Sequence, residues 1–291
     1  MSELQSNLEI SLSKDVLQDS TESVSSKNTN DSLLSNEEQS DDFNENHFEE
    51  ICRKFYVNSA DNSNSNFNAY IQSALHIIAN YPKKEHFKEE IEKKKIEMDN
   101  TSHKKTLILD LDETLVHSDV DFNFKYHDEI LKFIPEGGNE EILIPLILRP
   151  HLFEFLDFAS SLYELVIFTA SEKNYADAIL NFIEKDKKYF SYRLYRDSCI
   201  YLHPCFYIKD LDIIGNRKKE NLLIVDNSLF SFGNNLNNGI LISSFYNDKD
   251  DTMLCNLAHY LSHLSNVDDV RTVNKETFNF EHYLTVIKEE K

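Results

Sequence analysis

The stretch TLILDLDETLVH, residues 106 to 117, decides the fold of this chain. Its first four residues are apolar or β-branched, which is typical of a short buried strand. Two carboxylates, Asp110 and Asp112, follow the strand at once, and the hydroxyl of Thr114 comes two residues later. In an open parallel sheet, ligands bind where the chain leaves the carboxyl ends of the strands. The pattern therefore predicts a strand that ends in a functional loop.

Two carboxylates on such a loop predict a specific chemistry. They repel one another unless a cation lies near them, and Mg²⁺ is a hard cation that prefers oxygen ligands. One carboxylate can attack phosphorus to form an aspartyl-phosphate while its neighbour transfers the proton. The alternative is a buried strand that runs into an acidic turn, with Thr114 capping a helix. The motifs farther along the chain favour the chemical interpretation.

Strand and helix signals alternate from residue 104 onward, which predicts an α/β domain with a Rossmann-like, mainly parallel sheet. We expect strands at residues 106–109, 163–168, 221–225 and 240–243, and helices near residues 150–160, 172–183 and 251–264. Residues 118–148 contain an apolar run after a Gly-Gly turn signal. We expect them to form a small antiparallel β insert over the carboxyl ends of the strands, either as a substrate-gripping cap or as a plain surface hairpin.

Polar side chains of the required kinds follow the later strands. Thr169 can offer a hydroxyl to a phosphoryl oxygen, although a lone threonine there is more often a helix N-cap. Lys209 lies in an apolar run, where it could neutralise charge between nucleophile and phosphate or simply be a surface lysine. Asp226 and Asn227 offer oxygens to a divalent cation. The order of nucleophile, hydroxyl, lysine and acid–amide pair predicts one site for phosphoryl transfer.

The first 66 residues differ in composition from the rest of the chain. Residues 1–50 carry 13 acidic and 2 basic residues, so they contribute −11 to the formal net charge of −21. Such a segment cannot bury enough apolar surface to offset the entropy cost of ordering. We expect a disordered acidic tail over residues 1–66, solvated or used to recruit partners, and then a helical N-terminal extension over residues 67–100.

Composition argues against several classes of protein. A basic face is missing from the pattern, so direct nucleic-acid binding is not expected. No apolar run approaches membrane-spanning length, and the first residues lack the pattern of a secretory signal. The four cysteines form no Cys-X-X-Cys pair, which is typical of reduced thiols in an intracellular protein.

The order of these motifs resembles the haloacid-dehalogenase superfamily. Within it, residues 110–117 closely resemble the small phosphatases that act on the C-terminal domain of RNA polymerase II. The resemblance covers roughly residues 104–264 and continues through RPH (149–151), FTAS (168–171), YAD (175–177), YRDSC (195–199), YIKDL (207–211) and VDNS (225–228). It implies a phosphatase domain over residues 101–270, followed by a C-terminal tail over residues 271–291.

The resemblance also implies roles for the catalytic and metal-binding residues. Asp110 would be the nucleophile, and Asp112 the general acid and base. Mg²⁺ would be held by Asp110, the backbone carbonyl of Asp112 and Asn227, and Asp226 would support either the metal or Lys209.

On the substrate side, the resemblance implies that Thr169 and Lys209 bind the phosphoryl group. Arg196 and Tyr175 would lie toward the substrate, as would Thr114, which would also hold the nucleophile loop in place.

The implied activity is that of a Mg²⁺-dependent phosphoserine/phosphothreonine protein phosphatase, with the C-terminal domain of RNA polymerase II as a candidate substrate and the nucleus favoured over the cytoplasm. The chain departs from the family pattern at Leu148, Asn174 and Ser244, where the family carries lysine, a basic residue and tryptophan. None of these three belongs to the chemical set. The alternatives are a phosphatase of another phosphoprotein or of a small phosphate ester, and a non-catalytic adaptor or scaffold of the same fold.

Overall fold

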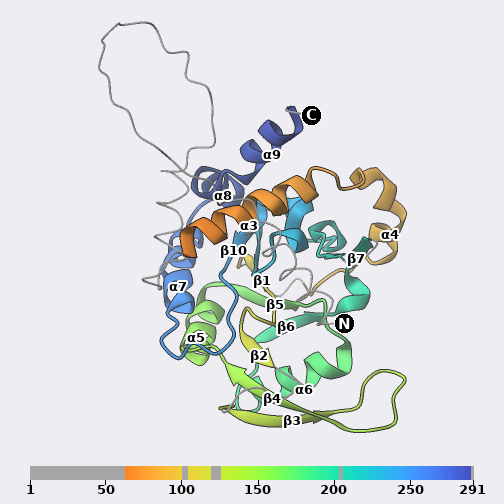
Figure 1. Cartoon of the computed structure of the whole chain (residues 1–291), viewed down its shortest axis with the longest axis vertical. Coiled ribbons are helices and arrows are strands. Elements are labelled where there is room, and N and C mark those ends of the chain that lie inside the picture. Colours follow the sequence, from red (N-terminus) through yellow and green to blue (C-terminus); the bar gives the residue numbers. More distant parts are fainter. Residues whose placement is uncertain (1–62, 100–103, 119–125, 203–205, 290–291) are drawn as a thin grey trace, which may run out of the picture. The chain divides into compact units, whose positions relative to one another are not determined.

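A five-stranded parallel sheet in the order β10-β9-β1-β5-β6 lies at the centre of the computed structural model (Figure 1). The structure describes residues 63–99, 104–118, 126–202 and 206–289, which all belong to one compact unit, Phe48–Lys291. The strands are β1 (Thr106–Leu109), β5 (Glu164–Phe168), β6 (Phe190–Leu194), β9 (Leu222–Asp226) and β10 (Gly239–Leu241). Strands β1, β5 and β9 are buried along their whole length, as expected for continuous apolar runs covered on both faces.

Three helices cover the sheet: α5 (Leu152–Leu162), α6 (Lys173–Ile183) and α7 (Met253–Leu264). Each buries one apolar stripe at helical spacing; in α6, for example, the buried residues are Ala176, Ile179, Leu180 and Ile183. The four strands and three helices expected from the sequence are all present, with bounds shifted by at most two residues. The expected α/β fold with a mainly parallel sheet is therefore confirmed.

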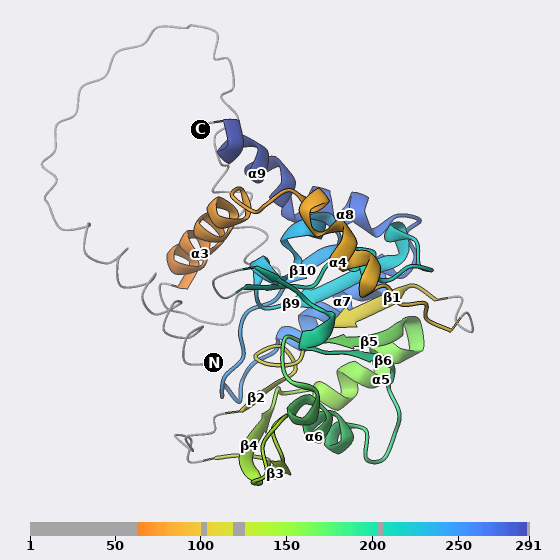
Figure 2. The same ribbon diagram turned by 90° about the vertical axis from the view of Figure 1, so that its right-hand side faces the viewer.

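The expected antiparallel insert is also present. It consists of β2 (Val116–Ser118), β3 (Glu129–Phe133) and β4 (Ile142–Leu148) in the order β2-β4-β3. Figures 1 and 2 show it beside α6, on the side of the molecule opposite to α3 (Ser63–Ile78). The insert follows directly from the loop after β1, so it lies next to the carboxyl end of that strand.

The N-terminal extension is helical only in part. Helix α3 buries Ile71, Ala74, Leu75 and Ile78 and packs against the segment η5 (Leu229–Asn238). The short helices η1 (Lys84–Phe87) and α4 (Lys88–Lys93) follow. The chain then leaves the helix because Ile96 pairs with Ile214, and its N–H lies 2.7 Å from the carbonyl of Ile213. The expected disordered tail lies outside the described residues over positions 1–62, and the domain boundaries stay predictions.

Several elements were not expected from the sequence. Edge strand β6 and the hairpin of β7 (Ile200–Leu202) and β8 (Phe206–Ile208) belong to this group. Residues 271–291, expected as a tail, contain most of α8 (Val270–Phe278) and α9 (Phe280–Glu289). Phe278 and Phe280 are buried there, and their rings stack with centroids 5.5 Å apart. Among the helices that the structure describes, none is long and apolar enough to cross a bilayer.

Candidate active site

The ends of three neighbouring strands bring the expected site residues to one edge of the sheet. Leu109 at the end of β1 pairs with Ile167 of β5 and Val225 of β9. The next residues of these strands, Asp110 and Asp226, are therefore neighbours, and Thr169 follows β5 at the same edge. The loop after Asp110 turns sharply, because Glu113 has a positive φ of 57° and its N–H bonds to the carbonyl of Val116 at 2.7 Å.

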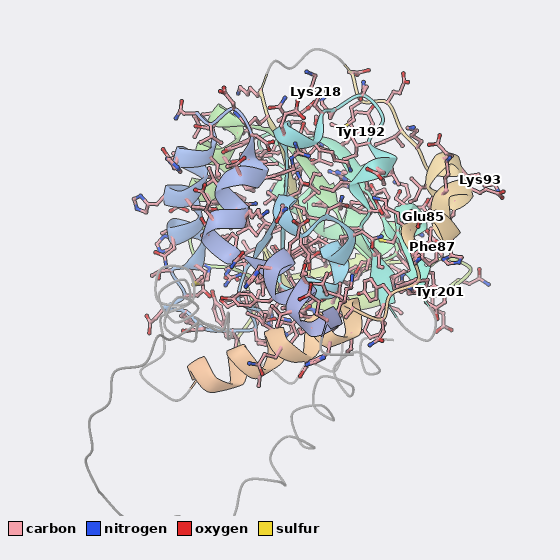
Figure 3. The ribbon with its side chains drawn as sticks, turned by 90° about the horizontal axis from the view of Figure 1, so that it is seen from above. Glu85, Phe87, Lys93, Tyr192, Tyr201 and Lys218 are labelled. Carbon is pink, nitrogen blue, oxygen red and sulfur yellow. The ribbon has the colours of Figure 1, made fainter. Side chains whose placement is uncertain are left out.

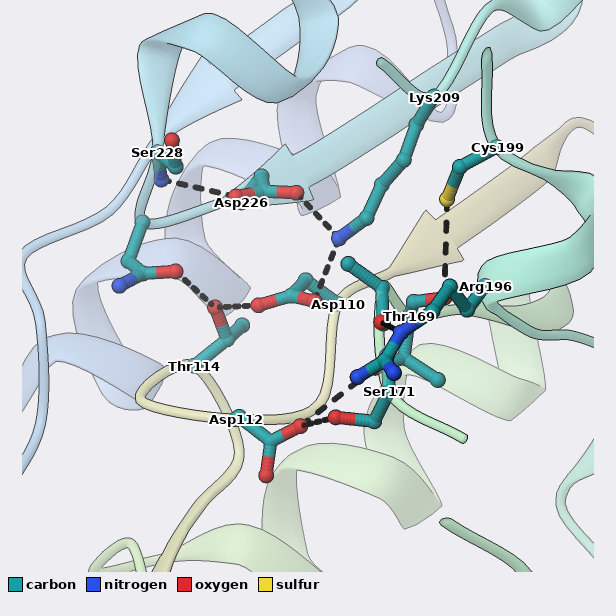
Figure 4. Close-up of polar contacts among 12 residues, drawn as sticks. Asp110, Asp112, Thr114, Thr169, Ser171, Arg196, Cys199, Lys209, Asp226 and Ser228 are labelled. Atoms are coloured by element: carbon teal, nitrogen blue, oxygen red, sulfur yellow. Dashed lines mark hydrogen bonds and ion pairs between the residues drawn. The ribbon is translucent and has the colours of Figure 1, made fainter. Parts of the chain in front are cut away.

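Asp110, Lys209 and Asp226 form one half of the site, which we call the lysine side (Figure 4). Lys209 Nζ donates to Asp110 Oδ1 at 2.5 Å and to Asp226 Oδ2 at 2.6 Å. All three side chains are buried. Lys209 reaches them from the end of β8, and its own N–H bonds to the carbonyl of Ser231 at 2.7 Å. The structure thus assembles residues that are 17 to 116 positions apart in the sequence.

The charges of the lysine side do not balance. Burial alone lowers the pKa of Lys209, but the negative charges of Asp110 and Asp226 outweigh this effect and raise it. Burial, together with the charge of Asp110, raises the pKa of Asp226 to about 7. Both shifts follow from one buried cation shared by two buried carboxylates. A further cation near Asp110 would remove this excess of negative charge.

Asp110 and Asn227 provide oxygens where such a cation could bind. Thr114 Oγ1 donates to Asp110 Oδ2 at 2.8 Å and lies 3.5 Å from Asn227 Oδ1. A hydroxyl has a single proton, and the shorter contact takes it, so the Asn227 oxygen still has lone pairs for a cation. Across the described part of the chain, no three His, Cys, Asp or Glu side chains converge as a metal site. A carboxylate, an amide oxygen and backbone carbonyls nevertheless suit Mg²⁺, which keeps several of its waters.

Asp226 is placed differently from the other candidate metal ligands. Its Oδ2 accepts from Lys209, and its Oδ1 accepts from the N–H of Ser228 at 2.8 Å. Both carboxylate oxygens of Asp226 therefore already have a hydrogen-bond donor. Of the two roles considered for Asp226, this geometry favours support of Lys209.

Asp112 lies in the other half of the site, which we call the hydroxyl side: Asp112, Thr169, Ser171 and Tyr175. Tyr175 donates to Asp112 Oδ1 at 2.6 Å, and Ser171 Oγ donates to Oδ2 at 2.6 Å. Thr169 Oγ1 lies 3.5 Å from Oδ2 and accepts from the N–H of Ser171 at 3.0 Å. Burial raises the pKa of Asp112, although the hydrogen bonds from Ser171 and Tyr175 oppose the shift. A carboxyl group with a raised pKa is suited to general acid catalysis.

Tyr175 connects the hydroxyl side to the β insert. Its hydroxyl also bonds to Ser118 at the end of β2, and its ring lies edge-on to Phe133 of β3, with centroids 5.6 Å apart. Burial and the charge of Asp112 raise the pKa of Tyr175 well above its ordinary value, so the phenol keeps its proton and donates it. Sequence analysis placed Tyr175 toward the substrate; the structure places it directly on Asp112.

Arg196 lies at the rim of the site. Its Nε donates to the carbonyl of Ala170 at 2.6 Å, and its Nη1 pairs with Glu172 at 3.2 Å. The guanidinium lies over the ring of Tyr207, 5.5 Å from the centroid. The Arg196 side chain thus lies along the loop that carries Thr169 and Ser171, and it is partly exposed to solvent.

Sequence analysis assigned no role to Arg149, which holds the loop after β1 from behind. Its fully buried guanidinium forms a two-pronged ion pair with Asp251, with contacts of 3.0 and 2.8 Å. It also donates to the carbonyls of Thr114 and Ser243, both at 3.0 Å. One side chain therefore fixes the loop after β1 to the segment after β10. An arginine inside an otherwise apolar stretch was the available signal, but its partners lie 35 to 102 residues away.

Comparison with known proteins matches the part of the chain that contains the central sheet to one family. Residues 105–271 match the family described as NLI interacting factor-like phosphatase. The chain is 41% identical over 180 residues to "CTD small phosphatase-like protein 2" of Dictyostelium discoideum. The aligned residues cover 62% of this chain and 31% of that protein. It is 36% identical over 178 residues to the human "Carboxy-terminal domain RNA polymerase II polypeptide A small phosphatase 1", covering 60% of this chain and 65% of that protein.

Other relatives carry different names. "Nuclear envelope morphology protein 1" of Schizosaccharomyces pombe is 38% identical over 168 residues, which cover 58% of this chain and 35% of that protein. The chain therefore spans less than two thirds of each of these three relatives. Among solved structures, that of "Fcp1, an essential RNA polymerase II CTD phosphatase" aligns with a TM-score of 0.41 at 19% identity, over 71% of this chain and 54% of that one.

Proposed function

Because the chain belongs to the NLI interacting factor-like phosphatase family, we propose that it is a Mg²⁺-dependent protein phosphatase for phosphoserine and phosphothreonine. The observation that supports this most directly is the position of Asp110. One of its oxygens is 2.5 Å from the Lys209 ammonium, and the other accepts from Thr114 Oγ1, which itself lies 3.5 Å from the amide oxygen of Asn227. A carboxylate set between a cation and a set of hard oxygen donors is suited to attack a phosphate ester.

In the proposed first step, an Asp110 oxygen forms a bond to phosphorus and the bond from phosphorus to the seryl oxygen breaks. Asp112 gives its proton to the departing seryl oxygen. Lys209 compensates the negative charge of the phosphoryl oxygens, and the Thr169 hydroxyl donates to one of them. A Mg²⁺ ion held by Asp110, Asn227 and the Asp112 carbonyl would supply further neutralisation of the phosphate charge.

In the proposed second step, water attacks the phosphorus of the aspartyl-phosphate. Asp112, now ionised, takes a proton from this water, and the phosphate leaves with Asp110 restored. The hydrogen bonds from Ser171 and Tyr175 orient the Asp112 carboxyl and stabilise its ionised form. Asp112 is thus acid and base in turn, and Arg196 at the rim is placed to contact the protein part of the substrate.

For the substrate we propose a phosphoprotein, and for the first one to try the C-terminal domain of RNA polymerase II. The names of two relatives, given above, support this choice of substrate. This substrate would place the protein in the nucleus. The relatives carry varied names, so the second candidate is a phosphatase that acts on another phosphoprotein. It would use the same chemistry, with different substrate contacts at the rim of the site.

The test is hydrolysis by the purified full chain of an aryl phosphate and of a panel of phosphoserine and phosphothreonine peptides. The panel contains polymerase-tail repeats and unrelated sequences. We expect turnover with Mg²⁺, its loss after chelation with EDTA and its return when Mg²⁺ is added back. Undiminished turnover after rigorous chelation would rule out the metal assignment. Absence of turnover on every substrate, with Mg²⁺ present, would favour the adaptor alternative.

A further inference from the structure

The N-terminal extension, residues 63–99, lies before the region that matches the family, residues 105–271, yet it contacts the loops that carry the site. Tyr70 accepts a hydrogen bond from the N–H of Leu229 at 3.1 Å, and the hydroxyl of Tyr81 donates to the carbonyl of Phe230 at 3.1 Å. These two contacts fall within three residues of Asn227. The extension is therefore packed behind the metal-binding side of the proposed site.

The contact nearest to the chemistry is made by Lys84 in η1. Its Nζ donates to Asp210 Oδ1 at 2.9 Å and pairs with Asp212 Oδ2 at 2.5 Å. Asp210 directly follows Lys209, and its exposed fraction is 0%. Partial burial would lower the pKa of Lys84, but its bonds to Asp212 and Asp210 outweigh this and raise it, so the ammonium is charged.

The other donors to Asp210 are neutral. They are the N–H of Asp212 and the side-chain amide of Asn234, each at 2.9 Å. The second cation of the cluster, Lys219, forms an ion pair with Asp212, with Nζ 2.6 Å from Oδ1. Among the described contacts, Lys84 is thus the cation bonded directly to Asp210. Without it, the direct partners of a fully buried carboxylate would all be neutral dipoles, and the nearby charge of Lys219 would act on Asp210 without a direct bond. Loss of the bonded cation from a buried carboxylate is costly in a protein interior.

We propose that Lys84 is a positioning residue for the reaction: by neutralising buried Asp210 it fixes the backbone from which Lys209 reaches Asp110. The inference rests on the proposed function. Lys209 Nζ lies within 2.6 Å of two carboxylates, so a shift of the peptide between positions 209 and 210 moves the ammonium relative to both. Misplacement of a catalytic group by about 1 Å can cost on the order of 10²-fold in rate.

The position of Lys84 is set independently of Asp210. Farther along the extension, the backbone of Met98 bonds to the Asn216 side chain in both directions, at 3.0 and 2.5 Å. Lys94 donates to the carbonyl of Asp197, next to Arg196, at 2.5 Å. Helix α3 is held by its buried stripe. Because these contacts fasten the extension on both sides of η1, loss of the Lys84 ammonium would disturb the Asp210 loop and leave the extension docked.

The experiment compares full-chain Lys84→Met with Lys93→Met and Lys84→Arg, using an aryl phosphate with Mg²⁺. Lys93 belongs to the same extension, and its side chain points outward at the molecular edge (Figure 3). We expect kcat of Lys84→Met to fall about tenfold or more, with a smaller change in KM. Lys84→Arg should stay within about threefold of wild type because it keeps the cation, and Lys93→Met should be unchanged. Equal kcat for Lys84→Met and Lys93→Met would overturn the inference.

A second comparison tests whether Lys84 acts through Asp210. Once Asp210→Asn has removed the buried charge, Lys84→Met should cause no further loss, so the double variant should turn over like Asp210→Asn alone. Losses that multiply in the double variant would show that the two residues act separately, and the inference would fail. The double variant has no unpaired buried charge, so this comparison remains decisive if Lys84→Met alone does not fold.

Binding of inorganic phosphate, measured by calorimetry, separates this inference from the proposed function. Absence of Mg²⁺-dependent turnover in wild type would reject the function, whereas phosphate affinity still reports on Lys209. We expect the dissociation constant of Lys84→Met to rise about tenfold over that of Lys93→Met. Identical affinities at a temperature where both variants are folded would overturn the positioning role, because a merely structural Lys84 would change only the unfolding temperature.

Discussion

Asp110 and Asp112 are separated by one residue in the sequence, but the lysine side and the hydroxyl side surround them with different chemistry. Asp110 Oδ1 accepts a hydrogen bond from the ammonium of Lys209 at 2.5 Å. Asp112 is held by the neutral hydroxyls of Ser171 and Tyr175, and burial raises its pKa. Two carboxyl groups with such different hydrogen-bond partners are suited to different tasks. The contrast supports the proposal that Asp110 attacks phosphorus and that Asp112 transfers the proton.

The largest expected effect is on the lysine side, from Asp110→Asn. The amide is nearly isosteric with the carboxylate but cannot attack phosphorus, so turnover should be abolished for the aryl phosphate and for every phosphopeptide. Steady-state rates, with circular dichroism to verify folding, measure this. A rate within about tenfold of wild type would place the nucleophile elsewhere.

Lys209→Met should remove both turnover and stability. Two buried carboxylates would lose their shared cation, and breaking a buried ion pair in this way typically costs roughly 3–5 kcal/mol. Urea unfolding monitored by circular dichroism gives the change in free energy of unfolding. Lys132→Met is the control, because its pair with Glu141 is exposed on both sides and its loss should leave the midpoint unchanged. Equal midpoints for both variants would contradict the account of the lysine side.

On the hydroxyl side, Asp112→Asn should affect the two steps differently. Loss of general acid–base help should lower turnover of phosphoserine peptides by roughly 10²–10⁴-fold. An aryl phosphate has a good leaving group that hardly needs a proton, so its first step should survive while the second stalls. We expect a burst of phenolate stoichiometric with enzyme, followed by slow turnover and an acyl phosphate that can be trapped on Asp110. Steady turnover without burst or trapped intermediate would show that Asp112 has no role in the second step.

A smaller effect is expected from Tyr175→Phe. The substitution removes one of the two hydroxyl donors to Asp112 and leaves the ring against Phe133. A hydrogen bond to a charged group contributes roughly 1.5–3 kcal/mol, so kcat on phosphopeptides should fall by roughly 10- to 100-fold. Tyr195→Phe is the matched control, because its hydroxyl bonds to Asp177 of the same helix α6, away from Asp112. Equal kcat values for the two variants would mean that Tyr175 does not orient Asp112.

The parts of the fold that could be predicted from sequence are those with a strong local signal. Strands β1, β5 and β9 are continuous apolar runs, and α5 to α7 carry apolar residues at helical spacing. Strand β6 was missed because it lies at the sheet edge and is only partly buried, so its pattern FSYRL is weak. The helical extension expected over residues 67–100 is interrupted because Ile96 pairs with Ile214, more than a hundred residues away. Tertiary contacts there outweigh local helix propensity.

The sequence by itself determined the chemical types at the site and their order along the chain. All of them except Lys209 follow a recognisable strand, and the carboxyl ends of parallel strands lie at one edge of the sheet. Only the tertiary structure decided which oxygen meets which donor. It gave both oxygens of Asp226 to Lys209 and Ser228, aimed Tyr175 at Asp112, and set Arg149 behind Thr114. These contacts join residues far apart in the chain, and burial fixes their geometry and shifts their pKa values. No local pattern encodes such contacts, since each depends on where the whole fold places the partner.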